Sequence, residues 1–108
     1  MTKKSAISID EVIPASTIKD RVIGLLKADK PYPLHIKTRW GIHTFGMKYA
    51  IDVVILDDNF TVQAIKTSLE PWRIFLWNPK FKHVLELPEG TIQNKHITTN
   101  SQLNLLQY

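Results

Sequence analysis

The stretch Ile51-Asp52-Val53-Val54-Ile55-Leu56, followed by Asp57-Asp58-Asn59, decides the fold. Five of its first six residues are apolar and most are β-branched, which predicts a β-strand. Apolar side chains point to both faces of this strand, so we expect it at the centre of a sheet. The polar cluster after it predicts a turn, and the apolar residues that follow predict a hairpin over residues 51–66.

Away from this hairpin, the pattern predicts more short strands and little helix. Alternating apolar residues over 5–13 predict an edge or half-buried strand that ends at Pro14. Further strands are expected at 34–37, 74–77, 83–87 and 103–106. One N-terminal helix is predicted over about 17–27, and a short helix near 91–95. The expected fold class is therefore α+β, mainly β, with about seven short strands in a bent-sheet or barrel-like domain.

Length and composition limit the class of protein. The 108 residues predict one domain over 1–108, and the hydrophobic (44%) and charged (22%) fractions are typical of a soluble globular protein. The lack of cysteine excludes a disulfide framework, a thiolate zinc site and a thiol nucleophile. The sequence contains neither a signal-peptide pattern nor an apolar run long enough to span a membrane, so the expected location is cytoplasmic.

The net charge of +4 raises nucleic acid as a partner. The basic residues are scattered along the chain, however, and few of them are arginine, the better phosphate ligand. Nucleic-acid binding would need basic side chains gathered on one face beside exposed aromatic rings. The aromatic run over 71–77 is too apolar for such a strip and favours a core or a subunit interface.

The segment Trp40-Gly41-Ile42-His43-Thr44-Phe45-Gly46-Met47 is the best candidate for a site. It carries one imidazole between two glycines, which let the backbone approach a ligand closely. If the segment is extended, His43, Phe45 and Met47 share one face, which suits a ligand of mixed polarity. The alternative is a structural histidine that donates to a backbone carbonyl near a bend.

Asp52 is the second candidate, because a carboxylate in so apolar a strand is costly to bury without hydrogen bonds. It could act as a general base or a metal ligand. It could equally accept hydrogen bonds from the backbone amides of residues 46–50, or pair with Arg21 or Lys48. We favour the structural reading.

Signatures of catalysis and of metal binding are missing. The histidines and buried-strand acids show no H-x-H, H-x3-H or H-E-x-x-H spacing, so we predict no metal and no cofactor. No G-x-S-x-G or phosphate-binding glycine loop occurs either.

Three motifs together carry a family resemblance. The first is His43-Thr44-Phe45-Gly46-Met47 with the strand 51–57 after it, the second is Arg21-x-x-Gly24-Leu25-Leu26, and the third is Val84-Leu85-Glu86-Leu87-Pro88-Glu89-Gly90-Thr91. In order and spacing they resemble DUF192, an uncharacterised bacterial and archaeal family, over about residues 12–106. The resemblance implies a compact β-rich domain and no known reaction. The polar or special members of the signature, taken as candidate ligand-binding residues, are His43, Thr44, Met47, Asp52, Arg21 and Glu86.

The C-terminal region departs from the family pattern. His96 and Asn100 replace two glycines, and both residue types tolerate positive φ, so we expect the turn geometry to persist. Ser101 replaces an acidic residue, which puts any charge or metal-binding role of that acid in doubt here.

These observations leave three functional hypotheses. We favour a non-enzymatic binding or accessory module with a small polar cleft near His43 and Asp52, whose partner is an unidentified small ligand or protein. The runner-up is a hydrolase-like or metal-assisted enzyme in which His43 is the base and Asp52 orients it. Nucleic-acid binding is the third.

Overall fold

The structure, a computed structural model, describes residues 6–15 and 32–107. The predicted helix over 17–27, and Arg21 within it, lie outside the described residues. The elements are β1 (Ile7–Ala15), β2 (Leu34–Lys37), β3 (Gly41–His43), β4 (Ile51–Leu56), β5 (Val62–Leu69), β6 (Ile74–Leu76), β7 (His83–Pro88), α2 (Thr91–Asn94) and β8 (Leu103–Gln107). In the described residues the fold is mainly β, with one short helix. None of the helices described is long and apolar enough to cross a membrane.

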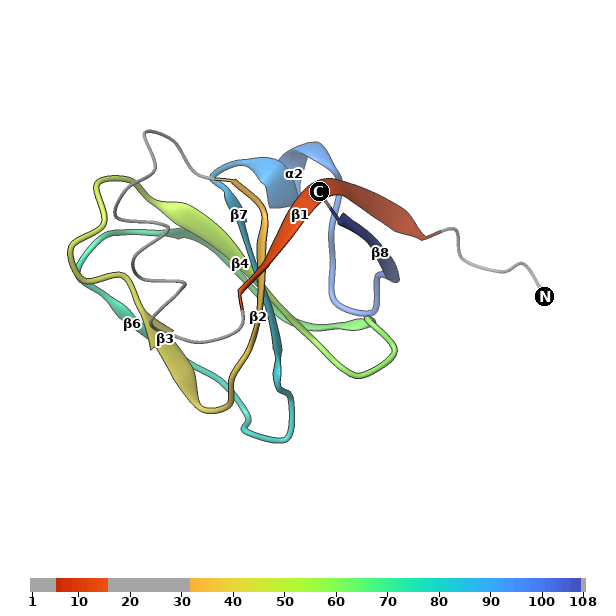
Figure 1. Cartoon of the computed structure of the whole chain (residues 1–108), viewed down its shortest axis with the longest axis horizontal. Helices are drawn as coiled ribbons and strands as arrows, with labels where there is room; N and C mark the ends of the chain where they lie inside the picture. Colours follow the sequence, from red (N-terminus) through yellow and green to blue (C-terminus); the bar gives the residue numbers. More distant parts are fainter. Residues whose placement is uncertain (1–5, 16–31, 108) are drawn as a thin grey trace.

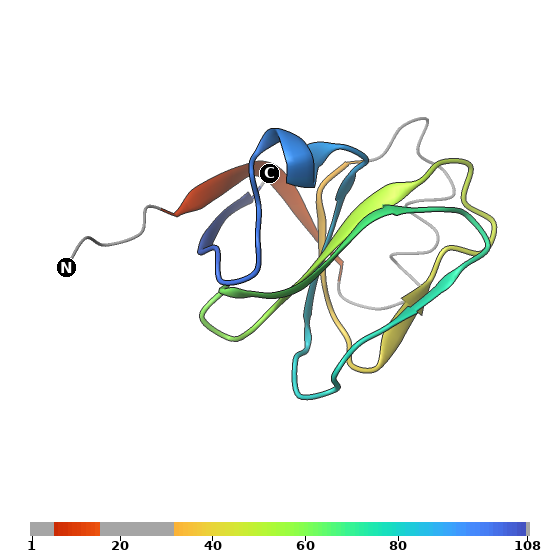
Figure 2. The same ribbon diagram turned by 180° about the vertical axis from the view of Figure 1, so that it is seen from behind.

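Six strands form one sheet in the order β5-β4-β7-β2-β1-β8, and β3 and β6 form a separate two-stranded ribbon. The large sheet curls into a half-barrel, and the ribbon lies at the end away from β8 (Figures 1 and 2). The two outer strands approach at one point, where Thr61 and Gln102 form an isolated bridge. The backbone N–H of Val62 donates to the Ser101 carbonyl there at 2.8 Å. The expectation of a bent, barrel-like sheet is confirmed in this form.

The central position of β4 is confirmed. It lies between β5 and β7, and all six of its residues are buried. Its two faces belong to two cores. Val54 and Leu56 pack with Leu85 and with Ile92 of α2, whereas Val53 and Ile55 pack on the side covered by the ribbon. Successive residues of β4 therefore point into the two cores in turn, which explains why residues 53–56 are all apolar.

β1 corrects one expectation, since the strand continues through Pro14 to Ala15. β1 runs parallel to both neighbours, but β8 pairs with its first part and β2 with Ile13 to Ala15. Pro14 therefore has a paired strand on one side only. In this half β1 is an edge strand, where a residue without an N–H is tolerated.

The C-terminal turns confirm another expectation. His96 and Asn100, which replace the glycines of the family pattern, have φ of 55° and 75°. Ser101 is buried, and its Oγ accepts a hydrogen bond of 2.9 Å from the Thr98 N–H. The serine thus stabilises the turn that precedes β8.

Candidate functional site

Asp52 is held entirely by backbone N–H groups. Its carboxylate is 1% exposed. Oδ1 accepts a hydrogen bond of 3.0 Å from Ser68, and Oδ2 accepts bonds from Gly90 (3.1 Å) and Ile92 (3.0 Å). Asp52 therefore fastens the irregular end of β5 and the start of α2 to the central strand. The amides differ from those of residues 46–50, but the interaction is of the expected structural kind.

Thr44 is also an anchor. Its fully buried hydroxyl donates to the Glu70 carbonyl at 2.6 Å and accepts a bond of 3.0 Å from the Arg73 N–H. Its own carbonyl accepts from the N–H groups of Met47 and Trp72. Thr44 thus joins the loop after β3 to the loop before β6.

Met47 and Glu86 are buried as well. Met47 packs in the core beneath the ribbon. Glu86 lies on β7 opposite Leu34 and Val53. Its charge adds to the effect of burial in raising the pKa of the Tyr32 hydroxyl. The Glu86 side chain is therefore buried near the partly buried Tyr32 and Tyr49, whose hydroxyl pKa values it helps to raise.

Among the predicted site residues that the structure describes, His43 differs in reaching the surface. Its Nδ1 accepts a hydrogen bond of 3.2 Å from the Phe45 N–H, and its ring stacks on Phe45 with centroids 4.7 Å apart. Phe45 stacks in turn on Trp72 at 5.9 Å. No hydrogen bond or ion pair joins His43 to Asp52 in the described part of the chain. The structure therefore does not bring the predicted pair together.

An apolar groove of about 300 Å³ lies beside His43. Gly41 and His43 of β3 oppose Leu76 and Ile74 of β6, so these four residues share the outer face of the ribbon. Ile74 and Leu76 are 61% and 68% exposed. A Cβ on Gly41 would lie 2.5 Å from Leu76 Cδ2, so this glycine lets the leucine lie across the ribbon. The groove is less polar than the expected cleft, and Asp52 does not line it.

Two exposed tryptophans near the groove have an unusual backbone conformation: Trp40 lines the groove, and Trp72 stacks on Phe45, which also lines it. Trp40 and Trp72 have φ of 80° and 63° and are about two-thirds exposed. The left-handed region costs a residue with a Cβ roughly 1–2 kcal/mol. Bulky residues held there at the surface are a feature of functional sites, where strain is retained for a purpose.

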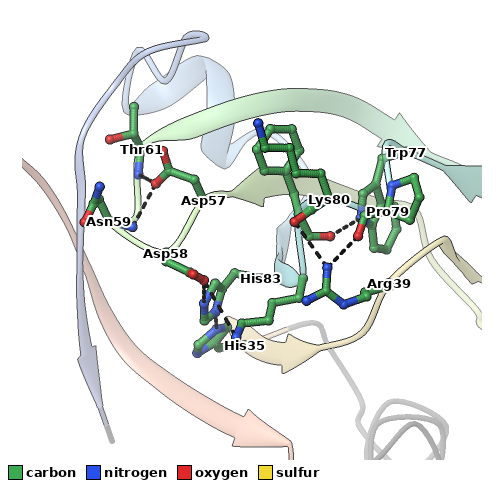
Figure 3. A network of polar contacts seen from close by, with 12 residues as sticks. His35, Arg39, Asp57, Asp58, Asn59, Thr61, Trp77, Pro79, Lys80 and His83 are labelled. Carbon is green, nitrogen blue, oxygen red and sulfur yellow. Dashed lines mark hydrogen bonds and ion pairs between the residues drawn. The ribbon is translucent and has the colours of Figure 1, made fainter.

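One basic side chain, that of Arg39, lines the groove, and a second arginine, Arg73, lies next to Ile74 in the sequence. Arg39 precedes Trp40, and its Nη1 donates to the carbonyls of Pro79 and Lys80 at 2.6 and 3.2 Å (Figure 3). Arg73 precedes Ile74 and contacts Glu70 at 3.5 Å with both side chains mostly exposed. The groove thus combines an apolar floor with one arginine in its wall.

A second polar cluster joins three residues that the sequence does not bring together. His35 Nε2 lies 2.9 Å from His83 Nδ1, and His83 Nε2 lies 3.1 Å from Asp58 Oδ1 (Figure 3). A carboxylate only accepts, so His83 donates to Asp58 through Nε2 and accepts from His35 through Nδ1. Burial, with the charges of His83 and Lys37, lowers the pKa of His35 to about 4. Burial also lowers the pKa of His83, against the opposing effect of Asp58.

Sequence patterns do not reveal the histidine pair, because His35 and His83 lie 48 positions apart and only the register of β2 against β7 makes them neighbours. In the described ranges, no group of three or more His, Asp or Glu side chains could hold a metal ion.

The fold and these contacts define a class of protein: a small half-barrel domain in which Asp52 and Thr44 of the sequence signature hold backbone segments together. The model of the family DUF192, described as "Uncharacterized ACR", matches residues 2–105, and the chain belongs to this family. It is 35% identical over 86 residues to UPF0127 protein PH1112 of Pyrococcus horikoshii, covering 74% of each chain. It is 29% identical over 109 residues to UPF0127 protein PF1050 of Pyrococcus furiosus, covering 95% of this chain and 92% of that one.

A solved structure from Sinorhizobium meliloti 1021, named a "putative transcription regulator", has the same fold. It matches with a TM-score of 0.73 and 16% identity, covering 82% of this chain and 76% of that one. At this identity the likeness concerns the fold alone.

Proposed function

We propose that this protein is a non-enzymatic binding module that holds an extended, apolar segment of an acidic partner protein in the groove beside His43. The observation that carries the proposal is the outer face of the β3–β6 ribbon. Its centre is aliphatic and its sides are aromatic, and in the described residues no layer of the protein covers it. A contiguous apolar patch on a soluble domain is typical of an interaction site.

The ribbon suits an extended segment. β3 and β6 pair only with each other in the described residues, so each keeps one open edge. A partner strand that adds to such an edge gains main-chain hydrogen bonds, and alternate side chains would then lie on the face of Ile74 and Leu76.

The charges favour an acidic protein as the occupant. Arg39 lines the groove, and the whole chain carries a net charge of +4. A second copy of the chain would bring like charges together, which disfavours self-association. A nucleic acid would stack on exposed rings such as Trp40 and Phe45, but the exposed Ile74 and Leu76 side chains offer it neither a ring nor a charge for its phosphates.

The enzyme hypothesis, with His43 as the base and Asp52 orienting it, lacks a supporting contact in the described residues. Both carboxylate oxygens of Asp52 accept from backbone N–H groups, and His43 Nδ1 accepts from the Phe45 N–H. A base and the group that orients it must lie within hydrogen-bond reach of each other or be joined through a water.

A displayed random-peptide library selected on the immobilised protein tests the proposal. We expect enrichment of peptides with alternating apolar residues flanked by Asp or Glu, and binding that is lost in Trp40→Ser and Leu76→Ser. Leu106→Ser, which changes an exposed leucine on β8, is the matched control and should bind as the wild type does. Two results would refute the proposal: no enriched sequence, or selected peptides that bind both groove variants normally. Stronger binding of a single-stranded oligonucleotide at Trp40 and Trp72 would assign the groove to nucleic acid instead.

A further inference from the structure

A separate pocket of about 340 Å³ lies where β1, β2, β7 and β8 meet the turn after β4. Apolar side chains form part of its wall: Val12, Pro14, Phe60 and Leu105. Polar groups form the rest: His35, Lys37, His83 and Gln107. The pocket and the groove share no lining residue, so the two sites are independent.

The turn after β4 does not need Asp58, the acid that accepts a hydrogen bond from His83. Asp57 satisfies that turn, since its Oδ1 accepts from the N–H groups of Asn59 and Thr61. Its Oδ2 accepts from the Gln63 amide. Asp58 is therefore available to hold His83, and a carboxylate behind a histidine fixes the tautomer and the orientation of the ring.

The tautomers leave one nitrogen available. His35 donates to His83 through Nε2, so Nδ1 of His35 carries a lone pair and receives no hydrogen bond from the described residues. The rings are held in place, because Phe60 packs edge-on against both, with centroids 5.6 and 5.1 Å away. A fixed imidazole with an open nitrogen, a lysine and an apolar wall thus line one small cavity.

We infer that this pocket binds a small organic monocarboxylate with a short apolar tail, and that His35 takes up one proton as the anion binds. Lys37 supplies a positive charge, the Gln107 amide a hydrogen-bond donor, and Phe60 with Leu105 a surface for the tail. The proton comes from solvent to Nδ1 of His35, and the new N–H donates to the carboxylate. The Nε2–H bond to His83 persists throughout, and the proton returns to solvent when the ligand leaves.

The charges around His35 explain the coupling. Lys37 on β2 and Lys82 just before β7 are cationic, Asp58 on the turn after β4 is anionic, and His83 lies between them. The lining residues from β1 and β8 are uncharged. An empty pocket therefore disfavours a charged His35, whereas a bound anion offsets Lys37 and favours it.

Titration calorimetry with sodium benzoate tests the inference, at slightly acidic pH and in two buffers of different ionisation enthalpy. We expect saturable binding, proton uptake that approaches one per site, and affinity that falls as the pH rises. Inorganic phosphate, which has no apolar tail, should not bind. Lys37→Gln should weaken benzoate binding about tenfold, and His35→Gln should abolish the proton uptake. Lys48→Gln, another exposed lysine, is the matched control.

The inference is overturned if benzoate gives no saturable heat, if phosphate binds as well as benzoate, or if Lys37→Gln binds normally. Should His35→Gln fail to fold, the dependence of the wild-type binding heat on the buffer still decides the proton uptake. Trp40→Ser should bind benzoate normally, which separates this test from that of the groove.

Discussion

The carboxylate of Asp52 accepts a hydrogen bond of 3.0 Å from the backbone N–H of Ile92, 40 residues further along the chain. Asp52→Ala removes the acceptor for this N–H and for those of Gly90 and Ser68. A buried donor left unpaired costs about 1–3 kcal/mol. We therefore expect the free energy of unfolding to fall by about 3–5 kcal/mol, measured by urea denaturation.

Asp52→Asn keeps one oxygen and should lose about half as much. Asp10→Asn changes an exposed acid on β1 and should leave the unfolding free energy unchanged. A fully stable Asp52→Ala protein would contradict the anchoring role and reopen a chemical one.

Thr44 offers a second test of the claim that residues of the sequence signature hold the fold together. Thr44→Val keeps the shape of the side chain but leaves the Glu70 carbonyl and the Arg73 N–H without their bonds. We expect a loss of about 2 kcal/mol in the free energy of unfolding. Thr44→Ser retains the hydroxyl and should lose markedly less. Equal stability of the valine and serine variants would show that the hydroxyl does not hold the ribbon.

The left-handed backbone at Trp72 predicts an unusual order of stability. Trp72→Gly and Trp72→Ala lose the same stacking on Phe45, but only glycine adopts a φ of 63° without steric cost. The glycine variant should therefore be about 1 kcal/mol more stable than the alanine variant. Thermal unfolding of the two proteins measures the difference. An alanine variant that equals or exceeds the glycine variant in stability would argue against strain at this position.

His35 predicts how stability changes with pH. Its pKa is about 4 in the folded protein and 6.5 for an unperturbed imidazole, so the unfolded chain binds a proton over this range that the folded chain does not. The contribution of His35 to the free energy of unfolding should be fully present above pH 6.5. It should fall as the pH decreases toward 4, by at most about 1.4 kcal/mol per pH unit. Urea unfolding across the range measures the slope.

His35→Gln should reduce that slope, whereas His96→Asn, which changes an exposed histidine outside the pair, should keep it. An unchanged slope in His35→Gln would show that another group is responsible.

Much of the fold could be predicted from local sequence. The apolar run of β4 fixes a central strand, and the turn residues after it fix the hairpin with β5. The tolerance of His and Asn for positive φ predicts the two turns before β8. These features depend on a few neighbouring residues, so periodicity and turn chemistry suffice for them.

The candidate sites depend on pairings between distant residues, which local patterns do not encode. β3 has three residues, too few for a periodic signal, and the groove exists only because Gly41 and His43 align with Leu76 and Ile74. The pairing of β2 with β7 likewise brings His35 to His83. The structural reading of Asp52 could be argued from the cost of burying its charge, but the three amides that it binds come from elements far along the chain.

The most direct test of the proposed function is the backbone NMR spectrum of the ¹⁵N-labelled protein during titration with a peptide enriched in the selection. The account predicts saturable shift changes concentrated at Gly41, His43, Ile74 and Leu76, with the β8 resonances unchanged. Changes centred elsewhere, or none at a saturating concentration of a peptide that binds, would contradict the assignment of the β3–β6 groove as the binding site.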